Sequence, residues 1–309
     1  MKILLLGRDG QVGWELQRSL APLGEVVALG RDAHRNVDGL CGDLTDLDGL
    51  RATVRSLRPG VIVNAAAHTA VDKAESEVAL ATLLNAQAPG VLAQEAQALG
   101  AWLVHYSTDY VFDGSGDIPW QEDDDTGPLS VYGRTKREGE QAIMAACARH
   151  LIFRTCWVYA ARGNNFAKTM LRLAQTRDTL NVIDDQVGSP TGADLIADVT
   201  AQAVHQVVHG MDAAHRLAGV YHLAAAGTTS WFAYAKYVLA QAVIAQPAIK
   251  LVANQVNPVA SSAFPTAARR PQNSRLNTTK LQAVFGLHLP PWQVGVARML
   301  SEMDHAPKL

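Results

Sequence analysis

Residues 2–13 read Lys2-Ile3-Leu4-Leu5-Leu6-Gly7-Arg8-Asp9-Gly10-Gln11-Val12-Gly13 and form the stretch that decides the fold. A short apolar run leads into three evenly spaced glycines, and a helical pattern follows over residues 14–20. Strand, glycine turn and helix in this order can bind a dinucleotide, because free N–H groups and the helix dipole favour phosphate. An ordinary strand-to-helix loop can also be rich in glycine. The stretch predicts the start of a parallel α/β sheet.

Short apolar runs recur along the first half of the chain, with room for a crossover helix between them. They cover residues 26–29, 61–64, 102–107 and 151–155. This alternation predicts an α/β fold with a Rossmann-type doubly wound parallel sheet, covered by helices on both faces. Ligands of such sheets bind at the carboxyl ends of the strands. We therefore expect residues 64–71 and 107–109 to line one crevice.

The pattern loosens after about residue 156. Loop-rich segments there surround an apolar strand at 219–223 and a helical stretch at 232–245. We predict a dinucleotide-binding domain over residues 1–156, to which residues 182–218 return, and a smaller C-terminal substrate-binding lobe over residues 157–309.

Charge and composition are those of a cytoplasmic enzyme. The 309 residues carry a formal net charge of −2, with acids and bases interspersed, so no basic surface indicates a nucleic-acid partner. Three cysteines without paired spacing favour reduced thiols over disulfides or zinc. The first apolar run is too short for a signal peptide, and no later run predicts a membrane span.

Tyr132 and Lys136 stand four residues apart in Val131-Tyr-Gly-Arg-Thr-Lys136. That spacing places both side chains on one helix face, where an ammonium can lower the pKa of a phenol. A phenol tuned in this way can protonate a carbonyl oxygen as a general acid. Alone, the spacing is more typical of a half-buried ring beside a solvated charge. Together with the glycine turn it predicts a carbonyl reductase.

Four sequence motifs now add up to a family resemblance. The glycines of the turn, Asn64-Ala-Ala-Ala67, Ser107-Thr-Asp109 and the Tyr132/Lys136 pair resemble the extended short-chain dehydrogenase/reductases. More narrowly, residues 64–72, 107–112, 131–136 and 269–276 look like the dTDP-4-dehydrorhamnose reductase family, and the likeness covers nearly the whole chain. That family reduces the 4-keto group of dTDP-4-dehydrorhamnose to give dTDP-L-rhamnose, a donor for cell-surface polysaccharides such as lipopolysaccharide O antigen.

The resemblance implies a site as well as an activity. Tyr132 would protonate the developing alkoxide, Lys136 would stabilise the tyrosinate and hold the nicotinamide ribose, and Thr108 would bond the carbonyl oxygen or else cap the next turn. The expected cofactor contacts are Gly7, Gly10, Gln11, Val12, Gly13, Arg31, Asp32, Asp43, Leu44, Ala66, Ala67, His68, Thr69, Tyr132 and Lys136. The expected substrate contacts are Val71, Thr108, Asp109, Tyr132, Trp157, Asn165, Arg270 and Arg275.

Cofactor choice rests on Gly30-Arg31-Asp32, which follows the second strand. Arginine pairs with the 2′-phosphate of NADPH, whereas an acidic side chain accepts hydrogen bonds from the adenosine ribose of NADH. With both residue types present, we predict use of NADPH and NADH, with NADPH preferred through Arg31.

Several of the residues expected to bind the substrate have a second, structural interpretation. Trp157 could stack on the deoxysugar or thymine or could belong to the core. Asp109 could orient sugar hydroxyls or cap a turn. Arg270 and Arg275 suit the two phosphates of a dTDP-sugar but could be ordinary surface arginines.

Related proteins of the same superfamily have other functions, and single residues of this sequence argue for or against them. A dehydratase has a glutamate after the Thr-Asp pair, and Tyr110 stands there instead. Another nucleotide-sugar 4-ketoreductase or an epimerase of the same superfamily would share Thr108, Tyr132 and Lys136 and stays open. A non-catalytic regulatory subunit is a third alternative, against which the complete trio argues. Members of the family are also homodimers with Mg²⁺ at the subunit contact, and Glu15, Asp194 and Glu302 fall at the matching positions.

Overall fold

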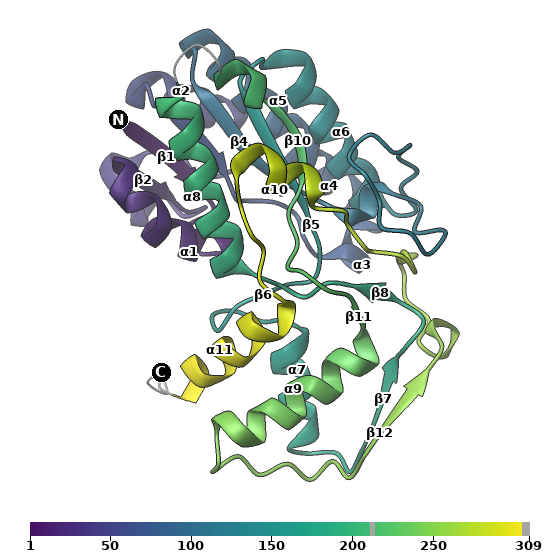
Figure 1. The fold of residues 1–309 in the computed structure, drawn as a ribbon. Coiled ribbons are helices and arrows are strands. Elements are labelled where there is room, and N and C mark those ends of the chain that lie inside the picture. The colour runs from purple at the N-terminus through teal and green to yellow at the C-terminus, as the bar shows by residue number, and fades with distance from the viewer. Residues whose placement is uncertain (211–213, 305–309) are drawn as a thin grey trace.

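A six-stranded parallel sheet forms the core of the upper part of the molecule in the computed structural model, which describes residues 1–210 and 214–304 (Figure 1). Its strands lie in the order β10-β5-β4-β3-β1-β2. Their bounds are β1 (Lys2–Leu6), β2 (Glu25–Leu29), β3 (Val61–Asn64), β4 (Trp102–Thr108), β5 (His150–Thr155) and β10 (Gly219–His222). Leu6 of β1 pairs with Leu29 and Asn64, so these strands end level with one another. The predicted fold class is confirmed.

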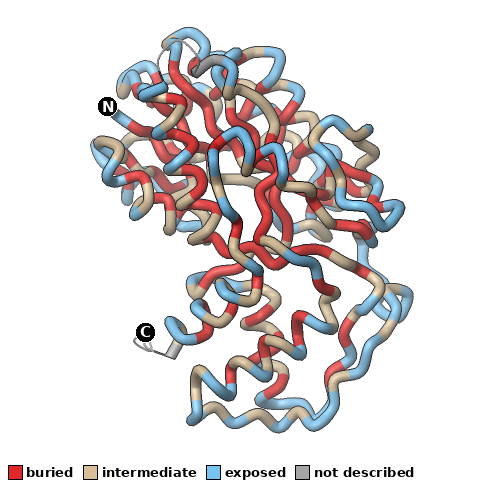
Figure 2. Tube along the Cα trace, in the orientation of Figure 1, coloured by how far each residue is buried: buried red, intermediate tan, exposed pale blue. Residues whose placement is uncertain are grey.

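Both faces of the sheet are buried, which is why its strands are continuous apolar runs. Ile3 and Leu5 pack with α1 (Gln11–Leu20) and α8 (Ala193–His209). Leu4 and Leu6 point to the opposite face, toward α2 (Leu47–Leu57) and α5 (Ala88–Leu99), with α6 (Val131–Ala146) beside them. Figure 2 shows this buried layer running through the upper part of the molecule.

Later segments of the chain also pack on the sheet. Helix α8 packs along α1, and β10 extends the sheet beside β5. Helix α10 (Thr279–Phe285) also reaches this core through Leu281 and Phe285. The structure thus adds β10 and α10 to the predicted returning segment 182–218, of which residues 211–213 lie outside the described residues. The domain boundaries themselves stay a prediction.

A smaller group of elements lies beyond the carboxyl ends of the strands (Figure 1). Helices α7 (Phe166–Ala174), α9 (Trp231–Ala245) and α11 (Trp292–Asp304) share a core that includes Leu171, Tyr234 and Trp292. Three two-stranded pairs accompany them: β7 (Thr179–Ile183) with β12 (Gln255–Val259), β6 (Val158–Tyr159) with β9 (Thr191–Gly192), and β8 (Val187–Gly188) with β11 (Thr229–Ser230).

Short helices connect these longer elements. They are η1 (Ala21–Leu23), η2 (Ala33–Arg35), η3 (Val37–Gly39), α3 (Val71–Ala74), α4 (Val78–Thr82), η4 (Leu83–Gln87), η5 (Asp109–Val111), η6 (Ala214–Leu217) and η7 (Ser261–Ala263).

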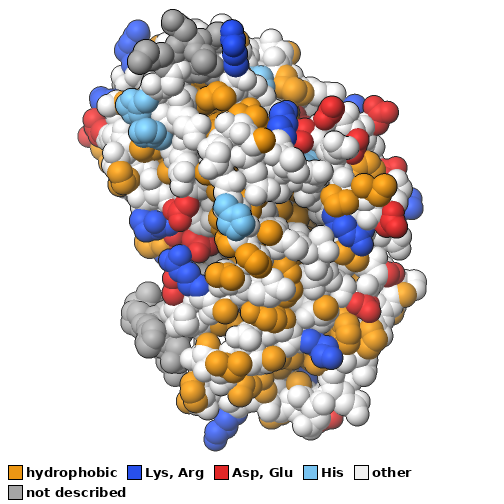
Figure 3. All heavy atoms as spheres, viewed as in Figure 1, with side chains coloured by type: hydrophobic (Ala, Val, Ile, Leu, Met, Phe, Trp, Pro, Cys, Tyr) orange, Lys and Arg blue, Asp and Glu red, His pale blue; other side chains and the backbone are white. Residues whose placement is uncertain are grey.

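On the face drawn in Figure 3, acidic and basic side chains are interspersed. Within residues 1–210 and 214–304, no helix combines the length and apolarity needed to cross a membrane.

Helix α6 packs very close to neighbouring backbone because glycines face its contacts. A Cβ on Gly133 would lie 2.1 Å from the carbonyl oxygen of Tyr110, and one on Gly139 would lie 2.0 Å from that of Asn85. Real side chains never come so close, so only glycine fits at either position. This approach sets the depth of the residues on the same helix, including Tyr132 and Lys136.

A buried ion pair fixes α6 to β5. Arg154 donates from Nε and Nη2 to the two carboxylate oxygens of Glu140, at 2.9 and 2.7 Å. Its Nη1 donates to the carbonyl oxygen of Glu122 at 3.1 Å, so the guanidinium is bonded on three sides. The side chains are 5% and 1% exposed, and removing one partner would leave the other charge buried without compensation.

We predict that Glu140→Ala lowers the free energy of unfolding by about 3–5 kcal/mol, as for other broken buried pairs. Urea unfolding would measure this loss. The matched control is Glu138→Ala on the same helix, which removes the exposed Arg134–Glu138 pair and should cost less than about 1 kcal/mol. Replacing both buried partners by leucine should recover part of the loss, and equal costs for Glu140→Ala and Glu138→Ala would contradict the assignment.

Candidate active site

The glycine turn has the geometry that the sequence suggests. Gly7 adopts φ +86°, and a Cβ there would lie 2.7 Å from the Ala66 backbone nitrogen. A Cβ on Gly13 would lie 2.0 Å from the carbonyl oxygen of Gly7, so α1 can begin this close only with glycine at position 13. Gly10 caps α1 without a side chain, which leaves the first N–H groups of the helix open to an anion.

A cleft of about 790 Å³ opens beside this turn, at the carboxyl ends of the strands. It combines residues from the turn, from the loops after β2 and β3, from the end of β4 and from α6, so the expected crevice exists. Of the sequence-predicted residues, those lining it are Gly7, Gly10, Gln11, Val12, Arg31, Asp43, Leu44, Ala66, Ala67, Thr69, Val71, Thr108, Asp109, Tyr132, Lys136 and Trp157.

Three expected cofactor contacts lie outside the lining. Gly13 lies against the turn, where its role is the close packing just described. The Asp32 side chain accepts from the backbone N–H of His34 and caps η2, while Arg31 beside it lines the cleft. His68 is buried. Its ring nitrogen Nε2 lies 2.8 Å from Glu77 Oε2, and its backbone N–H donates to Asn85 Oδ1. For Asp32 the structure favours a structural role.

Tyr132 reaches the cleft from the first turn of α6. Its ring packs edge-on against Tyr110, with centroids 5.5 Å apart. Burial raises the pKa of Tyr132 to about 12; the side-chain hydrogen bond with Thr108 opposes this shift and the charge of Asp109 adds to it. The expectation that Lys136 lowers this pKa is wrong for this structure, because the ammonium is engaged elsewhere.

Lys136 is almost fully enclosed one turn further along α6. Its Nζ lies 3.0 Å from His105 Nε2 and donates to the carbonyl oxygen of Tyr106 at 2.6 Å. Burial lowers the pKa of Lys136 to about 8, while the negative charge of Glu140 acts to raise it. A buried lysine of this kind changes charge close to neutral pH.

Thr108 and Asp109 form a hydrogen-bonded unit at the end of β4. The Thr108 hydroxyl donates to Asp109 Oδ1 at 3.0 Å and accepts from the backbone N–H of Tyr110 at 3.2 Å, so it does cap η5. Burial raises the pKa of Asp109 to about 6, against hydrogen bonds from Ser274 and Thr108. Asp109 Oδ2 and the nearby Ser107 hydroxyl are buried without a partner among the described residues. Such atoms suit a site that a polar ligand completes.

Trp157 lines the cleft in a strained conformation. Its φ is +47°, a region that residues with a large side chain rarely adopt. The ring stacks on Trp231 with centroids 3.5 Å apart and an angle of 15° between planes. Because Trp231 covers one face of this ring, stacking on a sugar is possible only from the remaining side.

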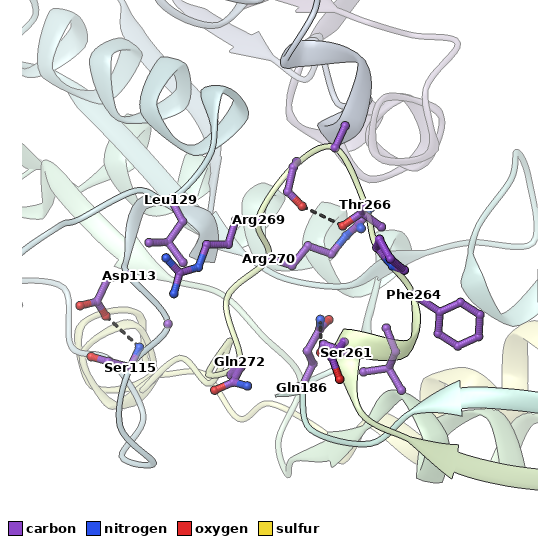
Figure 4. Close-up of a pocket in the computed structure, with 16 residues that line it drawn as sticks. Asp113, Ser115, Leu129, Gln186, Ser261, Phe264, Thr266, Arg269, Arg270 and Gln272 are labelled. Atoms are coloured by element: carbon purple, nitrogen blue, oxygen red, sulfur yellow. Dashed lines mark hydrogen bonds between the residues drawn. The ribbon is translucent and has the colours of Figure 1, made fainter.

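A second cavity, of about 570 Å³, lies beside the loop that carries Arg269 and Arg270 (Figure 4). Arg269 and Arg270 line it together with Gln186, Ser261 and Phe264. Arg270 donates to Asp72 Oδ2 at 2.7 Å, so its charge is already paired. Arg269 has no ion-pair partner among residues 1–210 and 214–304.

Two predicted substrate residues line neither cavity. Arg275 donates from Nη1 to the carbonyl oxygen of Asp117 at 3.1 Å and to Asn273 Oδ1 at 3.2 Å, which holds a loop in place. Asn165 caps α7 by accepting from the Lys168 backbone N–H, and its Nδ2 donates to Gln11 Oε1 at 3.1 Å. Asn165 therefore reaches the cleft only through Gln11.

The carboxylates proposed for Mg²⁺ each lie beside an arginine. Glu15 Oε2 lies 3.5 Å from Arg18 Nε. Arg298 Nη1 lies 3.6 Å from Asp194 Oδ2, and Arg298 Nε lies 2.8 Å from Glu302 Oε1. Across the described part of the chain, no cluster of three or more His, Cys, Asp or Glu side chains could hold an ion. The three carboxylates do share an electrostatic environment, since Asp194 and Glu302 both raise the pKa of Glu15, although burial raises it more.

Sequence reasoning missed several residues of the site. His105 is the polar neighbour of Lys136, Gly133 makes room for Tyr110, and Trp231 backs Trp157. A histidine inside the apolar run Trp102-Leu-Val-His-Tyr106 was an available signal, because a buried imidazole needs polar partners. Trp231 is separated from Trp157 by 74 positions and gave no such signal.

Comparison with known proteins agrees with this geometry. The family model described as "RmlD substrate binding domain" matches residues 1–305. The dTDP-4-dehydrorhamnose reductase of Escherichia coli (strain K12) is 57% identical over 303 residues, covering 98% of each chain. A crystal structure of such a reductase from Clostridium acetobutylicum superposes with TM-score 0.87 at 33% identity, covering 98% of this chain and 100% of that one. One from Bacillus anthracis, in complex with NADP, gives TM-score 0.86 at 33% identity, with 97% and 99% covered. This chain belongs to the dTDP-4-dehydrorhamnose reductase family.

Proposed function

We propose that this chain reduces the 4-keto group of dTDP-4-dehydrorhamnose to give dTDP-L-rhamnose, with NADPH or NADH as the reductant. One observation carries the proposal: Thr108, Tyr132 and Lys136 line the same cleft as the glycine turn. A dinucleotide on the turn and a carbonyl beside the trio would meet there. The family membership supports the choice of a dTDP-sugar as substrate.

The residues of the trio have separate tasks in this proposal. The reduced nicotinamide supplies a hydride to C4 when it is bound. Tyr132 donates its proton to the oxygen that becomes the alcohol. Lys136, whose ammonium is directed toward His105 and the Tyr106 carbonyl, would hold the nicotinamide ribose. Thr108 turns its hydroxyl from Asp109 to the keto oxygen and polarises it. The raised pKa of Tyr132 keeps the proton on the phenol until the reaction requires it.

The nucleotide arm of the substrate would extend past Tyr110 into the second cavity. Arg270 lies where the two cavities meet. Tyr110 lines the main cleft, and Arg270 acts on the pKa of the Tyr110 phenol as a side-chain hydrogen-bond partner. Arg269 adds a positive charge to the same wall. We assign the diphosphate to this pair in place of the Arg270/Arg275 pair that the sequence suggests.

The wider setting follows from the family resemblance. The proposed enzyme is cytoplasmic and homodimeric, and its product serves cell-surface polysaccharide such as lipopolysaccharide O antigen. Residues 1–156 with the returning segments bind the cofactor, and most of residues 157–309 bind the sugar nucleotide. The arginine-paired carboxylates described above argue against a magnesium requirement.

The alternative functions are an epimerase and a non-catalytic regulatory subunit. An epimerase uses the same trio but returns a keto sugar without net reduction. A regulatory subunit would show no turnover at all. Product analysis separates the three.

Incubation of the protein with NADPH and dTDP-4-dehydrorhamnose should yield dTDP-L-rhamnose as the main product, identified by NMR. Tyr132→Phe keeps the ring and removes the proton donor, so we expect turnover to fall by about 10²–10⁴-fold while NADPH binding persists. A C4 epimer as the main product, or a Tyr132→Phe enzyme with near-normal turnover, would overturn the proposed chemistry.

The pH dependence should follow Lys136. Burial lowers its pKa to about 8, so the side chain is charged below this pH and neutral above it. We expect kcat/KM, which reports the free enzyme, to decline as pH rises through about 8. Asp109→Asn is the control, because it removes a cleft carboxyl whose pKa burial raises to about 6 and should leave this limb in place. A decline that begins only above about pH 10, the ordinary range of a phenol, would assign the limb to Tyr132 instead.

Arg31→Ala should raise the KM for NADPH by about 10-fold or more, because a charge-assisted bond to the 2′-phosphate contributes roughly 1.5–3 kcal/mol. The KM for NADH should change little. Asp32→Ala provides a matched control, since this carboxylate caps η2 and does not line the cleft. Equal effects of Arg31→Ala on both cofactors, in steady-state kinetics, would remove the basis for the NADPH assignment.

A further inference from the structure

Behind the catalytic trio runs a buried chain of hydrogen-bonding groups. Lys136 Nζ lies 3.0 Å from His105 Nε2, and on the other side of the ring His105 Nδ1 lies 3.2 Å from Asn64 Nδ2. Asn64 Oδ1 accepts from the backbone N–H of Ala66 at 3.2 Å. The chain thus connects a proposed catalytic lysine with Ala66, which lines the cleft at the glycine turn.

The side chains of this chain are almost fully enclosed. Asn64, His105 and Lys136 are only 1%, 1% and 2% exposed. Burial, and to a lesser degree the charge of Lys136, hold the pKa of His105 well below its usual range, so the ring is neutral. A neutral imidazole has one N–H donor and one acceptor nitrogen. The position of this single proton decides what both neighbours can do.

In the first arrangement Lys136 is an ammonium. It has three donors and no lone pair, so His105 Nε2 must accept and the ring proton must lie on Nδ1. The Asn64 amide then has to turn its oxygen toward the ring to accept that proton. The amide nitrogen of Asn64 then lies beside the Ala66 N–H, so two donors face each other there until a ligand in the cleft accepts from the Ala66 N–H.

In the second arrangement Lys136 is a neutral amine. Its lone pair accepts from His105 Nε2–H, and Nδ1 accepts from Asn64 Nδ2. The amide oxygen of Asn64 then faces Ala66 and accepts its N–H, as in the bond of 3.2 Å. Any mixture of the two arrangements places two donors or two acceptors face to face at the histidine ring, which is costly in a buried site.

We propose that His105 is a positioning residue that couples the charge of Lys136 to the hydrogen bonding of the Ala66 N–H, through its tautomer and the Asn64 amide. The functional meaning rests on the proposed role of Lys136, whereas the coupling does not depend on which sugar is reduced. A cofactor group that accepts from Ala66 favours the arrangement with charged Lys136. By reciprocity, the charged lysine favours cofactor binding.

Few other charged groups act on Lys136 and His105. Glu140 on α6 raises the pKa of Lys136 and is itself held by Arg154 of β5. Asn64 on β3 is uncharged, and the Tyr106 group that faces Lys136 is a backbone carbonyl. The tautomer of His105 should therefore follow the protonation of Lys136 and no other group.

The ring proton can be followed by NMR of enzyme labelled with ¹⁵N in its histidines, without cofactor, between pH 6 and 10. We expect the His105 proton to move from Nδ1 to Nε2, with a midpoint near the Lys136 pKa of about 8. The spectrum of His105→Gln identifies the signal, and Lys136→Met should abolish its pH dependence. Saturating NADPH should raise the midpoint by about one pH unit, a tenfold gain in proton affinity. A tautomer that stays fixed throughout, or a midpoint that NADPH does not raise, would overturn the proposal.

Kinetics of two matched variants supply an independent test. His105→Phe removes the acceptor for the ammonium, so the basic limb of kcat/KM should move about one unit toward lower pH. His105→Gln offers an amide oxygen near the position of Nε2 and should keep the limb close to that of the unmodified enzyme. A limb that is identical in all three enzymes would reduce His105 to a packing residue and refute the coupling. The NMR titration needs no turnover to detect the tautomer change, so it remains decisive if the proposed reaction is wrong.

Discussion

The site depends on the close approach of α6 to the backbone beside the sheet. Gly133 and Gly139 leave no space for a side chain against Tyr110 and Asn85, and Arg154 holds Glu140, the residue after Gly139. Together they hold the helix at one depth. Tyr132 therefore reaches the cleft edge, and Lys136 lies beneath the end of β4. A glycine within the Tyr-x-x-x-Lys spacing is as much a part of this site as the two residues that bear the chemistry.

This depth determines the protonation behaviour of the site. Burial acts in opposite directions on a phenol and an ammonium, since it disfavours the charged form of each. Tyr132 consequently holds its proton more tightly, while Lys136 releases its own more easily. An exposed pair with the same spacing would show neither shift. The resting site thus has a proton donor that is stable until a developing negative charge appears beside it.

The sequence predicts the sheet and the glycine turn well because both depend on local patterns. Apolar runs and glycine spacing are visible over a dozen residues, and the predicted strand at residues 61–64 matches β3. It predicts less about polar side chains, whose partners are distant. Asp32 and Asn165 cap helices, and Arg275 bonds to loop residues, although each is a reasonable ligand by residue type. The direction of the Lys136 ammonium, away from Tyr132 and toward His105, depends on a contact between α6 and β4 that spacing alone cannot show.

The Trp157–Trp231 stack has an optical consequence. Two indoles 3.5 Å apart and nearly parallel couple their electronic transitions, which produces an exciton signal in circular dichroism and quenches their emission. Both rings line the cleft, whereas the four other tryptophans of the chain do not. The molecule therefore contains its own reporter of cleft occupancy, because any ligand that shifts Trp157 alters a signal that belongs to this pair alone.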